Sequence, residues 1–203
     1  MKTYAKEITM QKLELDILND LKIQKKISIW SIILTVISII PFFVLSFVSP
    51  SRGTSALLLP EGFSESLGGF SIFVNVMLVI VVFLLIVVAH EAIHGVFFKL
   101  FAPGKKVEFG FKSGMAYATS PGAVFSRLQF VTIILAPFIV ITTVLVIMMF
   151  VLPHGSYKYF LILHTGACIG DFYYVYLVLK NPQLKYCMDT SVGMSLYAED
   201  PNK

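Results

Sequence analysis

The chain has 203 residues, of which 57% are hydrophobic and only 14% are charged. Soluble domains carry about 25% charged residues, so this chain has too little polar surface for a water-soluble globule. Its net charge of +4 would suit nucleic acid or anionic lipid, but the lysines flank apolar runs and form no nucleic-acid-reading motif. We therefore expect one integral membrane domain in a lipid bilayer, and no nucleic-acid partner.

The N-terminal segment, residues 1–26, is too charged to be a cleavable signal peptide. Within residues 8–26, Leu13, Ile17 and Leu21 recur at every fourth position. This spacing predicts a short amphipathic helix that lies on the membrane surface.

Four apolar runs follow, at residues 27–48, 70–100, 127–152 and 158–179. Because about 20 apolar residues cross a bilayer, each run is long enough to be a transmembrane helix. A loop rich in Ser, Gly and Pro, residues 49–69, separates the first two runs, and Pro103-Gly104 ends the second. The predicted fold is an all-α integral membrane protein, with a four-span domain at residues 27–180 and a tail at 181–203.

Between the second and third runs, residues 105–122 have the pattern of two short strands. Val107, Phe109 and Phe111 alternate with other residues, and Ser113-Gly114 is typical of a turn. The pattern predicts a β-hairpin; the alternative is an irregular loop.

Lysine and arginine residues indicate the orientation. Residues 1–26 hold six, residues 99–127 hold five and residues 180–203 hold three, whereas the other two connections hold one each. Cytoplasmic loops carry the excess of these residues. We therefore expect a multi-pass protein of the bacterial cytoplasmic membrane, with both termini and the hairpin in the cytoplasm. The two cysteines, Cys168 and Cys187, indicate no disulfide framework.

The four runs contain only two acidic residues, Glu91 and Asp171. A charge at the bilayer centre costs roughly 2.5–3.5 kcal/mol on insertion scales, which makes both residues functional candidates. His90, Glu91 and His94 form an H-E-x-x-H motif. On a helix the two histidines share one face and can bind Zn²⁺, while Glu91 can act as the general base. The alternative is a pair of buried histidines that hydrogen-bond to their neighbours.

A catalytic zinc usually has three protein ligands. The metzincin extension would need glycine and histidine where the chain has Phe97 and Leu100. Glu108 lies in the predicted hairpin, beyond the proline that ends the second run. These two sources of a third ligand are therefore disfavoured.

Asp171 is better placed, because its depth matches that of the histidine pair. The centre of the pair is seven residues from Lys99, and Asp171 is nine residues from Lys180. At 1.5 Å per residue, both lie roughly 10–14 Å below the same membrane surface. We expect His90, His94 and Asp171 to be the metal ligands.

His164, Cys168 and Asp171 fall at positions i, i+4 and i+7 of the fourth run, on one helical face. His164 is a candidate for orienting a ligand or for stabilising the oxyanion of the reacting carbonyl; otherwise it is a satisfied polar residue of the bundle. Cys168 would close the site as a fourth ligand, unless it is simply a buried cysteine. Gly166 and Gly170 form a G-x-x-x-G pattern on the opposite face, against which another helix could pack.

The HEAIH sequence at residues 90–94, followed by Gly170-Asp171 in a later run, resembles the membrane-embedded zinc metallopeptidases of the site-2 protease type. More closely, residues 25–180 resemble a bacterial family of small four-span zincin-type peptidases. The resemblance implies that His90, His94 and Asp171 bind zinc and that Glu91 is the catalytic base. It also implies that the hairpin pairs with an extended substrate. The chain has Ile169-Gly170-Asp171-Phe172 where site-2 proteases have L-D-G, and it lacks their upstream N-x-x-P.

The sequence thus predicts a zinc-dependent intramembrane endopeptidase that acts on a membrane-anchored protein or a hydrophobic peptide. Two alternatives stay open: a metal-binding membrane protein without peptidase activity, such as a metal sensor or transporter, and an inactive module that binds a partner's span. Glu91 favours the enzyme, because a transporter needs no base at that position.

Overall fold

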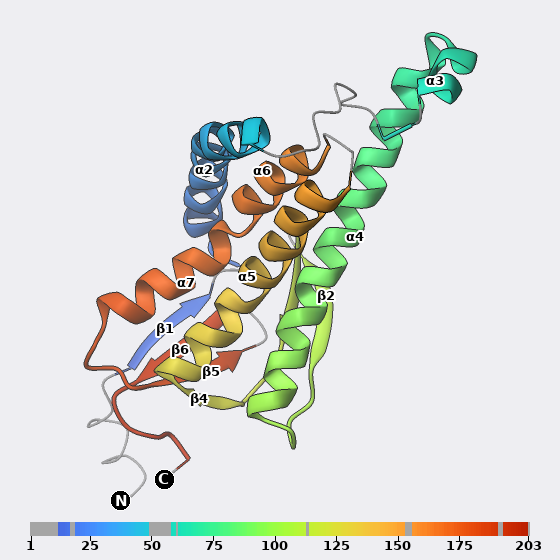
Figure 1. Ribbon diagram of the computed structural model, residues 1–203. Helices are drawn as coiled ribbons and strands as arrows, with labels where there is room; N and C mark the ends of the chain where they lie inside the picture. Colours follow the sequence, from blue (N-terminus) through green and yellow to red (C-terminus); the bar gives the residue numbers. More distant parts are fainter. Residues whose placement is uncertain are drawn as a thin grey trace, which may run out of the picture. The chain divides into compact units, whose positions relative to one another are not determined.

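The computed structural model describes residues 12–16, 19–48, 58–59, 61–112, 114–152, 156–190 and 193–202 (Figure 1). Its helices are α2 (Leu21–Val48), α3 (Glu61–Leu67), α4 (Phe70–Phe101), α5 (Arg127–Val151), α6 (Tyr157–Ala167) and α7 (Ile169–Lys180). Its strands are β1 (Lys12–Asp16), β2 (Glu108–Lys112), β3 (Met115–Thr119), β4 (Val124–Ser126), β5 (Tyr186–Thr190) and β6 (Gly193–Tyr197).

The chain divides into two compact units. Unit 1 comprises Met1–Ser28, Glu91–Pro137 and Gly170–Lys203, and unit 2 comprises Ile29–His90 and Phe138–Ile169. The long helices α4 and α5 each contribute residues to both units. The boundary on α4 falls inside the H-E-x-x-H motif, between His90 and Glu91.

Helices α2, α4 and α5 confirm the first three helical runs, and within the described ranges they are the helices long and apolar enough to cross a membrane singly. Large apolar side chains on them are exposed, for example Ile40 (71%), Leu85 (62%) and Ile147 (55%). A water-soluble protein would bury such faces, whereas lipid accommodates them.

The fourth run is not one continuous helix. It breaks at Cys168 into α6 and α7, which together count as a fourth candidate span. Gly166 and Gly170 flank the break, and glycine weakens a helix by about 1 kcal/mol relative to alanine. The expectation that His164, Cys168 and Asp171 share one helical face is therefore wrong, because Asp171 belongs to a different helix.

The expectation of a mostly helical protein with apolar spans and a hairpin is confirmed, but the fold is not all-α. Unit 1 also contains a four-stranded antiparallel sheet in the order β1–β6–β5–β4 (Figure 1). Its strands come from the N-terminal segment, the connection before α5 and the C-terminal segment. Backbone hydrogen bonding thus joins three segments that the apolar helices separate in sequence.

The amphipathic helix expected in residues 8–26 is replaced by strand β1 and the start of α2 in the described part of that segment. Leu13 and Leu15 pack against the core, while Glu14 between them is exposed. This alternation has the period of two that a strand requires. Ile17, which gave the helical spacing, lies outside the described residues.

The core of unit 1 joins this sheet to parts of three helices. Phe98 of α4, Ile133 of α5 and Val178 of α7 are buried together with Phe125 of β4 and Cys187 of β5. The aromatic rings of Phe98 and Phe125 are 5.7 Å apart. The core thereby fixes the end of α4 that carries Glu91 and His94 against the start of α5 and against α7.

The predicted hairpin is confirmed as the separate two-stranded sheet of β2 and β3. Its turn includes Gly114, whose φ of +80° favours glycine. The ring of Phe109 on β2 lies so close to Gly95 on α4 that a methyl group at Gly95 would come within 2.6 Å of it. The hairpin is therefore seated on the helix turn that carries His94.

In unit 2, helices α2 and α6 approach closely at Gly166. The hydroxyl of Ser31 donates a hydrogen bond of 2.8 Å to the carbonyl oxygen of Gly166, and Thr35 occupies the space that a side chain at Gly166 would need. Gly166 thus packs as the G-x-x-x-G pattern predicts, whereas nothing lies within 4 Å of the corresponding position at Gly170.

Candidate metal centre

The H-E-x-x-H motif lies on α4 with its functional side chains turned away from solvent. His94 is buried (5% exposed), and His90 and Glu91 are half-buried. Ala89 and Ala92, which point to other sides of the helix, are exposed. This burial pattern shows that His90, Glu91 and His94 face the interior of the protein.

In unit 1, the structure brings His94 and Asp171 together. The Nε2 atom of His94 lies 3.4 Å from Oδ1 of Asp171, and the two side chains are 7% and 13% exposed. Asp171 stands in the first turn of α7, directly after the helix break. The break thus begins a new helix at the point where Asp171 reaches His94.

The other ring nitrogen of His94 fixes its tautomer. Nδ1 lies 3.1 Å from the backbone carbonyl oxygen of Ile133 on α5. A carbonyl oxygen can only accept a hydrogen bond, so Nδ1 carries the proton and Nε2 of the neutral ring carries the lone pair. Metal-binding histidines have this arrangement, in which the second ring nitrogen donates to a carbonyl or carboxylate.

The spacing of His94 and Asp171 fits a zinc site. A lone pair on Nε2 and a carboxylate oxygen repel each other unless a cation or a proton lies between them. Zinc–nitrogen and zinc–oxygen bonds of about 2.0–2.2 Å in a tetrahedral site place neighbouring ligand atoms about 3.3–3.5 Å apart. The observed 3.4 Å, which is also that of an ion pair with a protonated histidine, lies in this range, so the two residues fit zinc in position and in chemistry.

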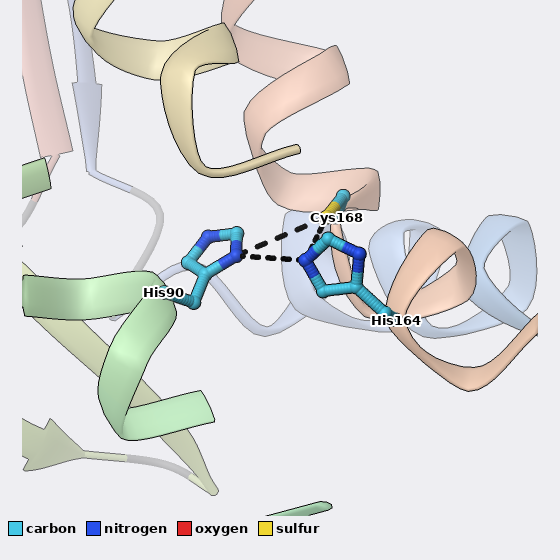
Figure 2. Close-up of side chains that lie close together, drawn as sticks. All are labelled: His90, His164 and Cys168. Atoms are coloured by element: carbon cyan, nitrogen blue, oxygen red, sulfur yellow. Dashed lines mark hydrogen bonds between the residues drawn. The ribbon is translucent and has the colours of Figure 1, made fainter. Parts of the chain in front are cut away.

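In unit 2, a second group forms around His90 (Figure 2). Its Nδ1 atom lies 3.4 Å from Nε2 of His164, and the thiol sulfur of Cys168 lies 3.5 Å from the same Nε2 and 3.9 Å from Nδ1 of His90. Figure 2 shows the three side chains converging from α4, α6 and the break after α6. The ring of Phe138 stacks on His164, with 6.2 Å between centroids and 10° between planes.

Five of the six residues singled out in the sequence lie in these arrangements, and Glu91 is the sixth. Asp171 accompanies His94, while His164 and Cys168 accompany His90. Glu108, which the sequence disfavoured as a ligand, is exposed on β2.

Asp189 on β5 is a buried acidic residue that the sequence analysis did not identify. Its carboxylate accepts hydrogen bonds from the hydroxyl of Thr119 and the backbone N–H of Ser120, and it interacts electrostatically with His94. Burial raises the pKa of Asp189 to about 6, although these hydrogen bonds and the electrostatic interaction with His94 lower it. The sequence of β5 has no apolar alternation that marks Asp189 as buried, and its inward position, shared with Cys187, is seen only in the structure.

Comparison with known proteins identifies one matching protein family. Residues 83–186 match the model of a family described as "Putative zincin peptidase". No curated protein and no solved structure matches the chain. The matched region runs from the middle of α4 into β5 and includes the H-E-x-x-H motif, His164, Cys168 and Asp171. Because the match covers more than half of the chain, the protein belongs to the family so described.

Proposed function

We propose that this protein is a zinc-dependent intramembrane endopeptidase that cleaves membrane-anchored proteins or hydrophobic peptides. The observation that carries the proposal is the pairing of His94 with Asp171. A histidine whose Nδ1 is held by a carbonyl presents Nε2 to a carboxylate at the spacing of two zinc ligands. The family assignment supports the same chemistry.

His90, His94 and Asp171 would hold the zinc ion. His90 lies one helical turn before His94 on α4 and therefore on the same face of that helix. When bound, zinc supplies Lewis acidity that polarises a peptide carbonyl and acidifies water to a pKa of about 7.

Glu91 is the proposed general base. It follows His90 directly, so its side chain points about 100° away around the helix and borders the ligand face without being part of it. Glu91 takes a proton from the attacking water and delivers it to the nitrogen of the leaving amine. Its half-buried position limits the water around it, which strengthens its electrostatic interactions.

The pairing of strands supports four membrane crossings. Strands β1, β4 and β6 belong to one sheet, so their segments lie on one side of any membrane that the helices cross. Between β4 and β5 the chain passes through α5 and then through the pair α6–α7. With one crossing by α5, one crossing by the broken pair would return the chain to the sheet. The lysine and arginine excess on these segments assigns that side to the cytoplasm.

The hairpin is the proposed binding surface for an extended substrate. Within the described residues, β2 and β3 pair only with each other, so both outer edges of this sheet can hydrogen-bond to another strand. The hairpin contacts α4 at Gly95, next to His94. A substrate strand along it would be unwound, which exposes the backbone carbonyls that a helix hides.

The variant Glu91→Gln tests the proposal, because it keeps the size of the side chain and removes the base. General acid–base groups contribute typically about 10²–10⁴-fold in rate. We expect the variant to bind zinc stoichiometrically, to lose cleavage by about that factor and to retain uncleaved substrate. The measurements are metal content of the detergent-purified protein and cleavage of co-expressed single-span proteins.

Two results would contradict the mechanism. Loss of metal from Glu91→Gln would make Glu91 a ligand. Wild-type protein that cleaves none of these substrates, but carries Zn²⁺ across vesicle membranes, would establish the transporter instead.

A further inference from the structure

His90, His164 and Cys168 form a second group of metal-binding atoms that the proposed peptidase does not use as a set. Each contributes one ligand atom, and the three atoms lie within 4.8 Å of one another. His164 and Cys168 are 2% and 1% exposed. All three residues belong to unit 2.

Two of the three distances within the group match those between metal ligands, and the third is about 0.3 Å longer. Zinc–nitrogen bonds of about 2.0–2.1 Å and a zinc–sulfur bond of about 2.3 Å give tetrahedral edges of about 3.3 Å between nitrogens and about 3.6 Å between nitrogen and sulfur. The observed separations are 3.4 Å for the nitrogens and 3.5 and 3.9 Å to sulfur. Hydrogen bonds between nitrogen atoms are commonly shorter, near 2.9–3.0 Å by analogy with N–H···O.

The end of α6 holds His164 and Cys168 close to each other. His164 and Cys168 are one helical turn apart at the end of α6, and the backbone N–H of Cys168 donates to the carbonyl oxygen of His164. Phe138 stacks on the ring of His164 and limits its rotation. Two of the three ligands are thus held in place by α6 and α5, and His90 on α4 completes the set.

We propose that His90, His164 and Cys168 form a second metal site for a borderline or soft cation such as Zn²⁺, Co²⁺ or Cd²⁺. Two imidazoles and a thiolate are the ligand types that such cations select over Mg²⁺ or Ca²⁺. Binding releases the thiol proton of Cys168 to solvent or buffer, because the thiolate is the metal ligand.

The site shares His90 with the proposed catalytic zinc. A neutral imidazole has one nitrogen with a lone pair at a time. When Nδ1 of His90 binds a cation beside Cys168, Nε2 carries the proton and is withdrawn from zinc. Excess metal would then inhibit cleavage. This consequence rests on the proposed function, whereas the site itself does not.

Co²⁺ titration of the detergent-purified, metal-free full chain tests the site. A cobalt–thiolate bond gives a sulfur-to-metal charge-transfer band in the near ultraviolet, which nitrogen and oxygen ligands do not give. We expect this band in the wild type and in His94→Ala, because His94 is not part of the set. Cys168→Ser should lose the band, and the matched variant Cys187→Ser, which removes the other buried cysteine, should keep it.

His164→Asn provides a second variant that retains the thiol, and it should weaken or abolish the band at the cobalt concentration that saturates the wild type. No band in the wild type would show that the group is only hydrogen-bonded and would overturn the proposal. So would a band that disappears in His94→Ala or in Cys187→Ser. The spectrum needs no substrate, so its result is separate from the presence or absence of peptidase activity.

Discussion

The ring of Phe109 on β2 lies against Gly95 on α4, where an added methyl group would be 2.6 Å from its Cζ atom. This contact joins the exposed hairpin to the helix turn that bears His94. Phe109 is 59% exposed, so its ring contacts α4 without being part of the buried core.

The variant Gly95→Ala should therefore displace the ring of Phe109, which forms this contact between the hairpin and α4. A displacement of about 1 Å can cost about 100-fold in rate when it misaligns reacting groups, so we expect cleavage to fall by about tenfold or more. Zinc content should stay at the wild-type level. The double variant Gly95→Ala/Phe109→Leu removes the clashing end of the ring and keeps an apolar side chain against α4. Recovery of cleavage would identify the displaced ring as the cause, and no recovery would contradict the proposed role of this contact.

Asp171 and Asp189 provide a matched comparison for the metal ligands, because both are acidic residues that interact with His94. Only Asp171 has an oxygen within 3.4 Å of Nε2, whereas the carboxylate of Asp189 is held by Thr119 and Ser120. We expect Asp171→Asn and His94→Ala to lose most of the bound zinc. Asp189→Asn and Glu108→Ala should keep it. Elemental analysis of the purified variants measures this, and zinc retained in Asp171→Asn but lost in Glu108→Ala would move the third ligand to the hairpin.

Asp189 should also make stability depend on pH. Its pKa is about 6 in the folded protein and 3.8 as the ordinary value. The folded state thus holds the proton more tightly. The resulting contribution to stability is present below pH 4 and is lost as the pH rises to about 6, in total about 3 kcal/mol.

Thermal unfolding in detergent with a chelator measures this contribution. The wild type should lose Tm relative to Asp189→Asn between about pH 4 and pH 6, and the difference should be constant above that range. Parallel curves for the two proteins across the range would show that Asp189 does not titrate there.

The orientation can be tested with introduced cysteines. Cys187 is unsuitable because it is fully buried, and burial raises the pKa of its thiol to about 12. Lys185 before β5 and Ser66 on α3 are both exposed. In intact cells, a membrane-impermeant maleimide should label Ser66→Cys and should label Lys185→Cys only after permeabilisation. The reverse pattern would place the termini outside.

Local patterns in the sequence determined the apolar helices, the hairpin and the H-E-x-x-H motif. Each depends on neighbours within a few residues: the length of an apolar run, the alternation of Val107, Phe109 and Phe111, and the four-residue spacing of His90 and His94. The depth match also indicated Asp171 as the partner of the histidines, and the structure places it beside His94.

The tertiary structure alone decided the four-stranded sheet, the role of the carbonyl of Ile133 and the grouping of His164 and Cys168 with His90. Strand pairing between β1 and β6 joins residues more than 170 positions apart, and no local period encodes such a pairing. Every residue has a backbone carbonyl, so the sequence does not indicate that the carbonyl of Ile133 contacts His94. The break at Cys168 puts Asp171 on a different helix from His164, and residues on separate helices no longer share a helical period.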